Sequence, residues 1–290
     1  MIDLKSAHQD FVADLKAKNR AHATILAYGK DIDQLVEFLE KKGIKDAEKV
    51  KLENLKAFTE DLFNQKYTAK SVSRKINSTK TFFRFLREQK DLKEDPASLL
   101  THPKYEVKPP RILTPIEYRA LRDACRGDAR TAAIVEILLQ TGIRISELAG
   151  IKINDLQFSQ GDTPGTLTIP DRPRHPKRVI PLNKAAQAAI QQYLKVRPKS
   201  KNQTLFITKT GKPLLIRNIR TVIDRYYRVA GIDDAKVNDL RHTFIATQLT
   251  AGVPLTDVSR LAGHKRLSTT EKYLEYVKER KESNVKLEEL

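Results

Sequence analysis

The stretch from Val237 to Tyr276 constrains the fold of this chain more than any other. Capping residues and glycines divide it into short helices joined by tight turns. A side-chain oxygen of Asn238 or Asp239 can cap the first helix, because it satisfies free backbone N–H groups there. Gly252 follows the last turn of that helix, where glycine is the usual stop.

Two more helices are expected before the stretch ends. Pro254 to Leu261 has apolar residues three positions apart, and Gly263 follows as its stop. Ser268 and Glu271 have the spacing of a capping box, so a third helix is predicted to start at Ser268 and to carry Tyr273 in its first turns.

These short turns place Arg241, His264 and Tyr273 on different elements that can converge. Together they would offer a guanidinium fork, an imidazole and a phenol. A guanidinium matches the geometry of phosphate oxygens, and a phenol can act as a nucleophile. The combination favours phosphoryl chemistry.

The same segment resembles the tyrosine recombinases, the phage-integrase and Xer family. Four runs carry the resemblance in the family's order: Thr141-Gly142-Ile143-Arg144-Ile145-Ser146-Glu147-Leu148, Leu240-Arg241-His242-Thr243, Ala262-Gly263-His264, and Ser268-Thr269-Thr270 with Tyr273. One such motif alone would be a weak signal. Four in order, with a matching hydrophobic pattern from roughly Leu113 to Tyr276, are a strong one.

The resemblance implies a mainly α fold with a small antiparallel β-sheet. Residues 1–101 would form a helical, SAM-like core-binding domain, residues 102–112 a linker, and residues 113–290 a mixed α/β catalytic domain with a tail from about 274 to 290. The two domains would form a clamp on DNA. The linker contains Pro103, Pro109 and Pro110, which disfavour helix and stiffen an extended crossing.

The resemblance also implies a mechanism. Tyr273 would attack a DNA phosphodiester to give a 3′-phosphotyrosyl link and a free 5′ hydroxyl, and exchange would pass through a Holliday junction. Arg144 and Arg241 would hold the non-bridging oxygens, His264 would hydrogen-bond the phosphate, and Glu147 would support Arg144 or simply pair with it. No metal, cofactor or ATP is expected, because fixed guanidinium groups can replace metal ions and no Walker-type loop is present.

The sequence departs from the family at the lysine that protonates the leaving 5′ oxygen. Counting back from Arg178, the usual lysine position falls on Pro173. Lys177 is the only lysine nearby and is assigned this role. Arg172 and Arg174 are alternatives for the role, but a guanidinium is a poor proton donor, so we expect them to contact DNA.

Asn238 is the second departure, because the family usually has histidine three residues before its second arginine. Asn238 and Arg241 share a helix face, so both could reach one phosphate. An amide can donate to a phosphate oxygen but cannot titrate as histidine does. The bland alternative is that Asn238 only caps the helix. Tyr276 is likewise a rival to Tyr273 as the nucleophile, although the motif spacing selects Tyr273.

Residues 1–100 predict four helices. The last, from Thr68 to about Lys90, has one face without acidic residues: Lys70, Ser73, Asn77, Lys80, Arg84 and Arg87. A row of charges is usually a solvated face. Here every charge on the face is positive, which favours contact with phosphates.

The remaining elements of the catalytic region follow from periodicity and turn residues. Expected helices start at Thr114 and cover Asp128–Gln140, Ser146–Ala149, Asn183–Arg197 and Arg217–Val229. Expected strands cover Ile151–Phe158, Thr166–Pro170, Arg178–Pro181 and Thr204–Thr208.

Charge and composition limit the class of protein. The chain has 290 residues, 54 Lys and Arg against 36 Asp and Glu, and a net charge of +18. Residues 1–100 hold 20 basic and 16 acidic side chains, so the excess lies mainly in the second part. Such charge favours nucleic acid as partner. The chain has one cysteine, Cys125, and no apolar run of the ~20 residues needed to span a bilayer. Its start lacks the pattern of a secretory signal. These features predict a cytoplasmic protein with no membrane partner.

The expected partner is double-stranded DNA with paired half-sites, bound by a tetramer across two sites; accessory DNA-binding proteins are candidate partners. The tail from 274 to 290 would dock on the next subunit, or else fold back over Tyr273. Two other functions remain open from sequence. A type IB topoisomerase would share the chemistry as a monomer, and an inactive DNA-binding protein would fit the changes at Pro173 and Asn238.

Overall fold

A computed structural model describes residues 2–89, 92–106, 108–171 and 176–277. The chain forms two compact units that divide between Lys108 and Pro109. Within the described ranges, no helix is both long enough and apolar enough to span a membrane. The division of function between residues 1–101, 102–112 and 113–290 stays a prediction.

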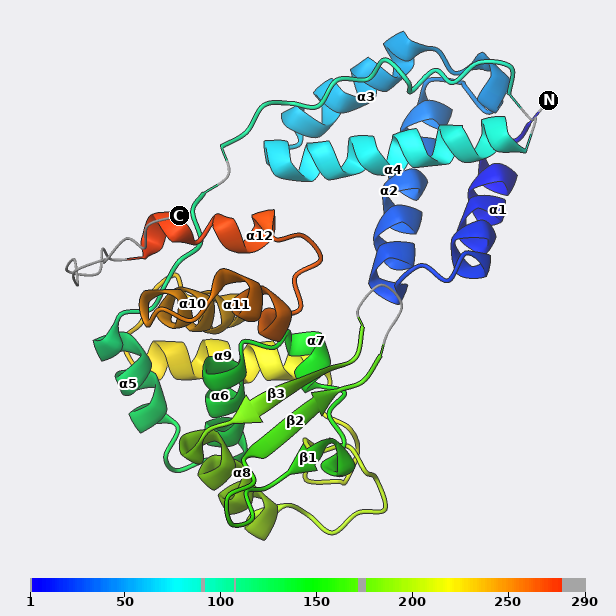
Figure 1. The fold of residues 1–290 in the computed structure, drawn as a ribbon. Coiled ribbons are helices and arrows are strands. Elements are labelled where there is room, and N and C mark those ends of the chain that lie inside the picture. The colour runs from blue at the N-terminus through cyan, green and yellow to red at the C-terminus, as the bar shows by residue number, and fades with distance from the viewer. Residues whose placement is uncertain (1, 90–91, 107, 172–175, 278–290) are drawn as a thin grey trace, which may run out of the picture. The chain divides into compact units, whose positions relative to one another are not determined.

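The first unit consists of the four predicted helices (Figure 1). They are α1 (Leu4–Ala17), α2 (His22–Lys41), α3 (Leu52–Asn64) and α4 (Ala69–Glu88), with a 3-10 turn η1 (Ala47–Lys49) before α3. Phe11 on α1 packs edge-on against Phe82 of α4, with ring centroids 5.4 Å apart, and Phe82 contacts Phe83 in the same way. These rings and Leu35 of α2 are fully buried, so the three longest helices share one core.

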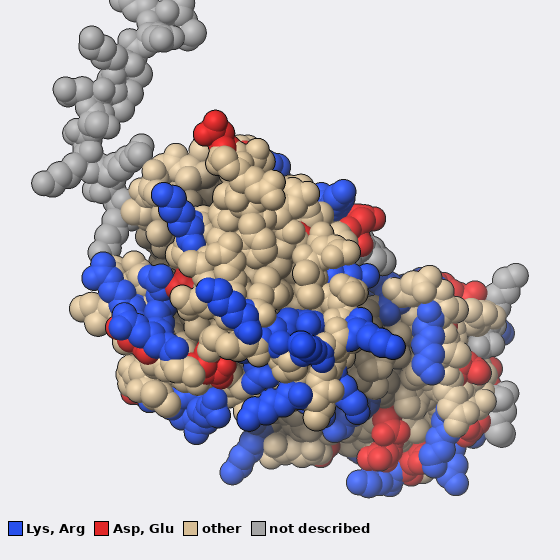
Figure 2. Space-filling view, turned by 90° about the horizontal axis from the view of Figure 1, so that it is seen from below, with Lys and Arg blue, Asp and Glu red and all other residues tan. Residues whose placement is uncertain are grey.

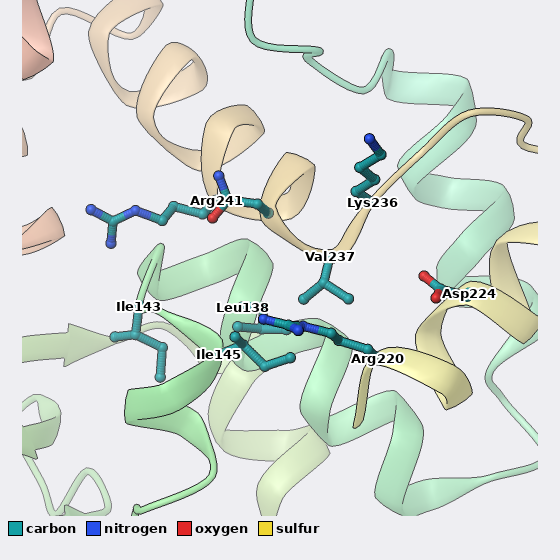
Figure 3. A pocket seen from close by; sticks show the side chains of 9 residues that line it. Leu138, Ile143, Ile145, Arg220, Asp224, Lys236, Val237 and Arg241 are labelled. Carbon is teal, nitrogen blue, oxygen red and sulfur yellow. The ribbon is translucent and has the colours of Figure 1, made fainter. Parts of the chain in front are cut away.

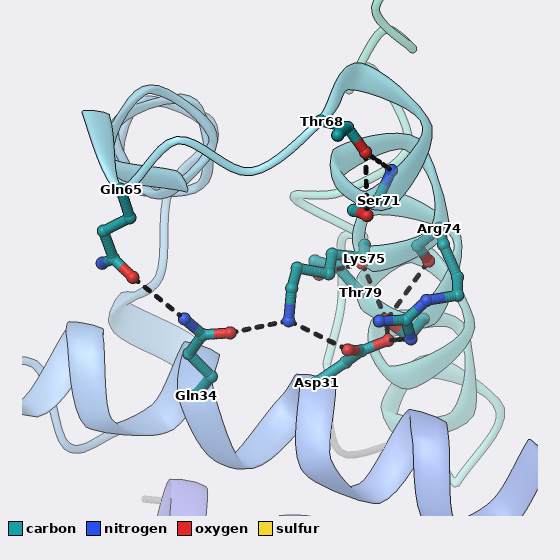
Figure 4. Close-up of polar contacts among 9 residues, drawn as sticks. Asp31, Gln34, Gln65, Thr68, Ser71, Arg74, Lys75 and Thr79 are labelled. Atoms are coloured by element: carbon teal, nitrogen blue, oxygen red, sulfur yellow. Dashed lines mark hydrogen bonds and ion pairs between the residues drawn. The ribbon is translucent and has the colours of Figure 1, made fainter. Parts of the chain in front are cut away.

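A buried polar cluster also joins α2 to α4 (Figure 4). Asp31 is 2 % exposed and accepts hydrogen bonds from Arg74, from Lys75 Nζ at 3.0 Å and from Ser78 Oγ at 3.0 Å. Lys75 Nζ also donates to Gln34 at 2.6 Å. Each buried charge here has an opposite charge beside it, which offsets the cost of removing both from water.

The second unit is mainly helical and contains one small sheet (Figure 1). Its helices before residue 237 are α5 (Pro115–Ala124), α6 (Ala129–Thr141), α7 (Ile145–Leu148), α8 (Lys184–Val196) and α9 (Ile216–Val229). All five lie within a residue or two of their predicted positions. Helix α6 is buried over most of its length and packs against α8 and α10, so it forms the centre of this unit.

The sheet is antiparallel in the order β1 (Leu156–Gln157), β2 (Gly165–Ile169), β3 (Arg178–Leu182). The strand predicted over 151–158 is right only at its end, and the strand predicted over 204–208 is wrong. Most of 151–158 is irregular, with a 3-10 turn η2 (Ile153–Asp155) before the two-residue β1. Residues 204–208 make only isolated bridges at Thr204 and Ile207, because their backbone groups bond to separate loops rather than to one strand.

The segment from 237 onward contains α10 (Val237–Thr250), α11 (Leu255–Ala262), α12 (Ser268–Glu271) and a 3-10 turn η3 (Leu274–Tyr276). Gly252 and Gly263 end α10 and α11 with φ of 83° and 67°, as predicted. The predicted cap of α10 is wrong by two to three residues. Its N-cap is Lys236, and Asp239 accepts the Lys236 N–H from inside the first turn at 2.7 Å.

The predicted capping box at Ser268 is also wrong. No side chain caps α12, which is a single turn, and Tyr273 follows it rather than lying within it. The N–H groups of Thr269 and Thr270 already bond to the carbonyls of Arg266 and Leu267. Because the preceding backbone satisfies them, no capping side chain is needed.

Candidate active site

Gly142 forms the corner that presents Arg144. It ends α6 in the left-handed conformation, with φ of 60°. A Cβ at this position would lie 2.2 Å from a ring carbon of Phe244, so both the backbone and the close packing of α10 require glycine. Arg144 follows as the N-cap of α7, and its side chain remains 30 % exposed.

Glu147 is the buried carboxylate around which the site is arranged. It accepts two hydrogen bonds from the Arg178 guanidinium, at 2.9 and 2.7 Å. It also accepts the backbone N–H of Arg144 at 2.8 Å and the Arg144 guanidinium at 3.3 Å. The fork-to-fork pair with Arg178 is the stronger geometry. Glu147 thus supports Arg144, but its main partner is an arginine that the sequence analysis did not assign.

The electrostatics of Glu147 follow from these partners. Burial alone would raise its pKa, but the Arg178 hydrogen bonds, the Arg144 N–H and both guanidinium charges lower the pKa to about 2. Glu147 is therefore ionised throughout the physiological range and forms a permanent anchor for both arginines.

Arg178 joins the sheet to the loop that carries His264. Its Nε donates to the Leu261 carbonyl at 2.9 Å, while Arg144 donates to the Gly263 carbonyl at 2.8 Å. A Cβ at Gly263 would lie 2.8 Å from the Arg178 guanidinium carbon. The end of α11 is thus held by two arginines that share one carboxylate.

A sequence signal for Arg178 was present. Positions 178, 180 and 182 alternate inward in β3, and Ile180 and Leu182 are core residues. An arginine in register with them must be buried, and a buried guanidinium needs an acidic partner.

Arg241 is 6 % exposed and donates to the Gly142 carbonyl. Burial, followed by repulsion from Arg144, lowers its pKa to about 10, so it stays charged at neutral pH. Among the described residues, no acidic side chain forms an ion pair with Arg241. Three guanidinium groups, from Arg144, Arg178 and Arg241, therefore share the single charge of Glu147.

His264 follows Gly263 and is held by Thr270. Its Nδ1 lies 2.7 Å from the Thr270 hydroxyl, which is fully buried. Burial, with repulsion from Arg241 and Arg144, lowers the pKa of His264 to about 4. The imidazole is therefore neutral at pH 7, and Nε2 is available to a ligand.

Tyr273 lies in the same site, 7 % exposed, in a cluster formed by α10 and α11. Its ring stacks on His264 with centroids 6.3 Å apart. Its hydroxyl lies 2.5 Å from Nδ1 of His242. Burial raises the pKa of Tyr273, and the positive charge of Arg241 opposes that rise.

Asn238 is exposed, and its amide contacts His242 rather than Arg241. The Asn238 Nδ2 and His242 Nε2 atoms are 2.7 Å apart. The two residues are four positions apart on α10, so they share a helix face. Asn238, His242 and Tyr273 form one hydrogen-bonded row. The motif resemblance implies no role for His242, but its spacing of four residues from Asn238 places both on one face of the helix.

A pocket of about 520 Å³ opens beside this row, between the end of α6, α9 and the start of α10 (Figure 3). Basic Arg220, Lys236 and Arg241 line it together with acidic Asp224, with Asn238 and with apolar side chains. In Figure 3 Arg220 extends from α9 beneath Val237, toward Leu138 and Ile145. The pocket is continuous with the arginine cluster and is mainly basic at its polar positions.

The hairpin residues proposed for DNA contact are only partly described. Lys177 is exposed and directly precedes Arg178, but no contact joins it to the arginine cluster among the described residues. Arg172, Arg174 and Pro173 lie outside the described residues. The proton donor for the leaving group therefore stays a prediction.

On α4, the predicted basic row is mostly exposed. Lys70, Asn77, Arg84 and Arg87 face solvent, and Lys80 is half-buried, with Nζ donating to the Ser98 carbonyl at 3.2 Å. Ser73 departs from the expectation because it is 9 % exposed and bonds to His102 at 3.0 Å. On the face drawn in Figure 2, Lys and Arg side chains cover more of the surface than Asp and Glu do.

Two family models match the chain. Residues 111–280 match the phage integrase family, and residues 9–90 match the phage integrase N-terminal SAM-like domain. The chain is 30 % identical to tyrosine recombinase XerC of Anoxybacillus flavithermus over 276 residues, which cover 90 % of each chain.

Two solved structures share the fold. One is the XerH site-specific recombinase bound to palindromic difH substrate, with a TM-score of 0.75, 19 % identity, and coverage of 91 % of this chain and 79 % of that one. The other is a lambda integrase (75–356) dimer bound to a COC′ core site, with a TM-score of 0.74, 16 % identity, and coverage of 98 % and 100 %. The predicted fold class, mainly α with a small antiparallel sheet, is confirmed.

Proposed function

The chain belongs to the phage integrase family and is a tyrosine-type site-specific DNA recombinase; we propose that Tyr273 is its nucleophile and that Arg144 and Arg241 hold the scissile phosphate. The observation that carries the proposal is the charge balance of the site. Among the described residues, the guanidinium groups of Arg144, Arg178 and Arg241 are balanced only by the Glu147 carboxylate, which pairs with the first two, so two positive charges remain for an anion. A phosphodiester gains negative charge in the transition state of its cleavage, and fixed cations stabilise that state most.

The reaction then follows from the positions of the groups. The Tyr273 oxygen attacks phosphorus, an O–P bond forms, and the bond from phosphorus to the 5′ oxygen breaks. His264, neutral with Nε2 available, hydrogen-bonds a phosphate oxygen. Lys177 supplies the proton to the leaving 5′ oxygen. The 3′-phosphotyrosyl link keeps the bond energy, so a 5′ hydroxyl of a partner strand can reverse the reaction through a Holliday junction.

Covalent trapping tests this assignment. The probe is a nicked duplex carrying the site that the full chain selects from a randomised duplex pool; the nick lets the freed end diffuse away and accumulates the adduct. We expect wild type and Tyr276→Phe to form the adduct and Tyr273→Phe to form none, with equal DNA affinity for all three. An adduct in Tyr273→Phe, or its loss in Tyr276→Phe, would move the nucleophile elsewhere.

The XerC relatives favour site-specific recombination over the two alternatives, which are relaxation of DNA by a topoisomerase and DNA binding without cleavage. The two units would clamp DNA between them, with Lys70, Asn77, Arg84 and Arg87 of α4 on the phosphates; Arg172 and Arg174 would contact it from the hairpin. A tetramer would form across two sites in the cytoplasm, and accessory DNA-binding proteins would be further partners.

The tail is proposed to join the subunits of that tetramer. Only residues 274–277 of it are described, and Val277 packs on the cluster around Tyr273 while Leu274 is 50 % exposed. A contact passed from each subunit to the next can close a ring. A chain truncated after Lys278 should still bind one site but lose pairing of sites and strand exchange. Full recombination by the truncated chain would rule out this role.

A further inference from the structure

Position 238 lacks the histidine that the family usually carries, yet an imidazole contacts the nucleophile from another position. His242 is one turn along α10 from Asn238 and places Nδ1 at 2.5 Å from the Tyr273 hydroxyl. The centroids of the two rings are 5.7 Å apart, and the ring planes are tilted by 36°.

The partner on the other ring nitrogen determines what Nδ1 does. An amide nitrogen can only donate, so Asn238 Nδ2–H bonding to Nε2 at 2.7 Å makes Nε2 an acceptor. A neutral imidazole carries one proton, which then lies on Nδ1. His242 is neutral at pH 7, because burial lowers its pKa, with Arg241 acting in the same direction and Asp239 against it.

From this geometry we propose that His242 is a catalytic residue: its Nδ1–H donates to the Tyr273 oxygen and stabilises the phenolate character that develops during attack, while Asn238 fixes the imidazole in the tautomer that can donate. The proposal rests on Tyr273 being the nucleophile. His242 gains and loses no proton. The phenolic proton passes to solvent, the Tyr273 oxygen bonds to phosphorus, and the leaving 5′ oxygen takes a proton from Lys177.

A matched pair of variants isolates the Nδ1–H group. In His242→Asn, the amide nitrogen takes nearly the position of Nδ1 and can still donate; in His242→Leu, a side chain of similar size cannot. Removing one preorganised donor from a developing oxyanion typically costs about 10²-fold. We expect adduct formation to slow about 10²-fold in His242→Leu and to stay within about 10-fold of wild type in His242→Asn. Both should bind the duplex normally, and exposed His22 replaced by Phe serves as the control.

A change of leaving group in the DNA distinguishes a role of His242 at the nucleophile from a general structural defect. A duplex with sulfur in place of the bridging 5′ oxygen has a leaving group that needs no proton. We expect this duplex to rescue Lys177→Ala and to leave the defect of His242→Leu unchanged, because nucleophile and leaving group are opposite ends of one displacement. Rescue of His242→Leu by sulfur, or a wild-type rate in His242→Leu, would overturn the proposal.

A double-mutant cycle tests the link through Asn238. If Asn238 acts only through the imidazole, Asn238→Leu slows wild type but adds nothing to His242→Leu. Additive effects would mean that Asn238 contacts DNA by itself, which overturns its part of the proposal. Nitrogen NMR of the full wild-type chain with ¹⁵N-labelled histidine gives an answer that needs no variant to fold: protonated Nδ1 and bare Nε2 are expected at His242, and the reverse pattern contradicts the proposal.

If wild type forms no adduct on the selected duplex, the proposed function itself fails. If wild type forms it and Tyr273→Phe does not, the function stands, and the behaviour of the His242 variants decides the further inference alone.

Discussion

The two units each place arginine or lysine side chains around one buried carboxylate, but they differ in whether every cation reaches that carboxylate. In the first unit, Asp31 faces buried Lys75 and the more exposed Arg74 (Figure 4). In the second, Glu147 pairs with Arg144 and Arg178, while Arg241 donates to a carbonyl and pairs with no carboxylate in the described part of the chain. In the first cluster both cations contact the carboxylate, and the surplus one, Arg74, is partly exposed to water. The second holds a buried cation, Arg241, that forms no ion pair among the described residues, and this is how a site for an anion differs from an ion network that only holds helices together.

Methionine variants of one cation in each cluster should differ most in the rate of catalysis. Arg241→Met keeps the length and packing of the stem but removes a cation from the developing phosphate charge. We expect covalent adduct formation to fall by about 10³-fold. Lys75→Met, measured on the same nicked duplex with the protein folded and saturating, should cleave at the wild-type rate. Equal losses in the two variants would refute the distinction.

Stability should show the reverse ranking. Lys75→Met leaves Asp31 buried with only the partly exposed Arg74, so the free energy of unfolding should fall by about 3 kcal/mol. Reversible urea unfolding of the first unit's transition measures this value. Lys70→Met, an exposed lysine on the same helix, is the control and should change little. A negligible loss in Lys75→Met would mean that the Asp31 cluster does not stabilise α2 against α4.

The Glu147 anchor predicts how stability depends on pH. Its folded pKa of about 2 lies below the ordinary value near 4.5, so its contribution is present above pH 4.5 and is lost as pH falls toward 2. The full contribution of such a shift is up to about 3 kcal/mol. Unfolding of wild type and Glu147→Gln should therefore differ most above pH 5 and converge in acid. A constant difference across this range would contradict the role of Glu147 as an ionised anchor.

The basic row on α4 should have the smallest effect on DNA binding and cleavage. It tests cations on a surface, in contrast to the buried cations of the two clusters. Neutralising Lys80, Arg84 and Arg87 together should weaken binding to any duplex. The log–log salt slope should fall by about 0.9 for each DNA phosphate that these side chains no longer neutralise. Lys80 already donates to Ser98, so its share should be the least. An unchanged slope would identify this row as a solvated face.

Sequence alone could predict the helices and the corners that bring Arg144, His264 and Tyr273 together, because both depend on local pattern. Gly142 and Gly263 fix the corners beside Arg144 and His264. The spacing of the Ser268-Thr269-Thr270 motif selects Tyr273. Contacts between distant positions could not be predicted in the same way. Arg178 and Glu147 are 31 residues apart, and so are His242 and Tyr273. Residues 204–208 failed as a strand because burial, not pairing, explains their apolar pattern.

The most direct test of the central claim is the free energy of unfolding of Arg241→Met without DNA. If the site holds an excess of buried positive charge for a phosphate, removing Arg241 relieves desolvation and repulsion from Arg144 while losing one hydrogen bond to Gly142. We therefore expect the stability of the second unit to stay within about 1 kcal/mol of wild type, or to rise. A loss of about 3 kcal/mol or more would show that Arg241 is already compensated within the protein, and would contradict the claim.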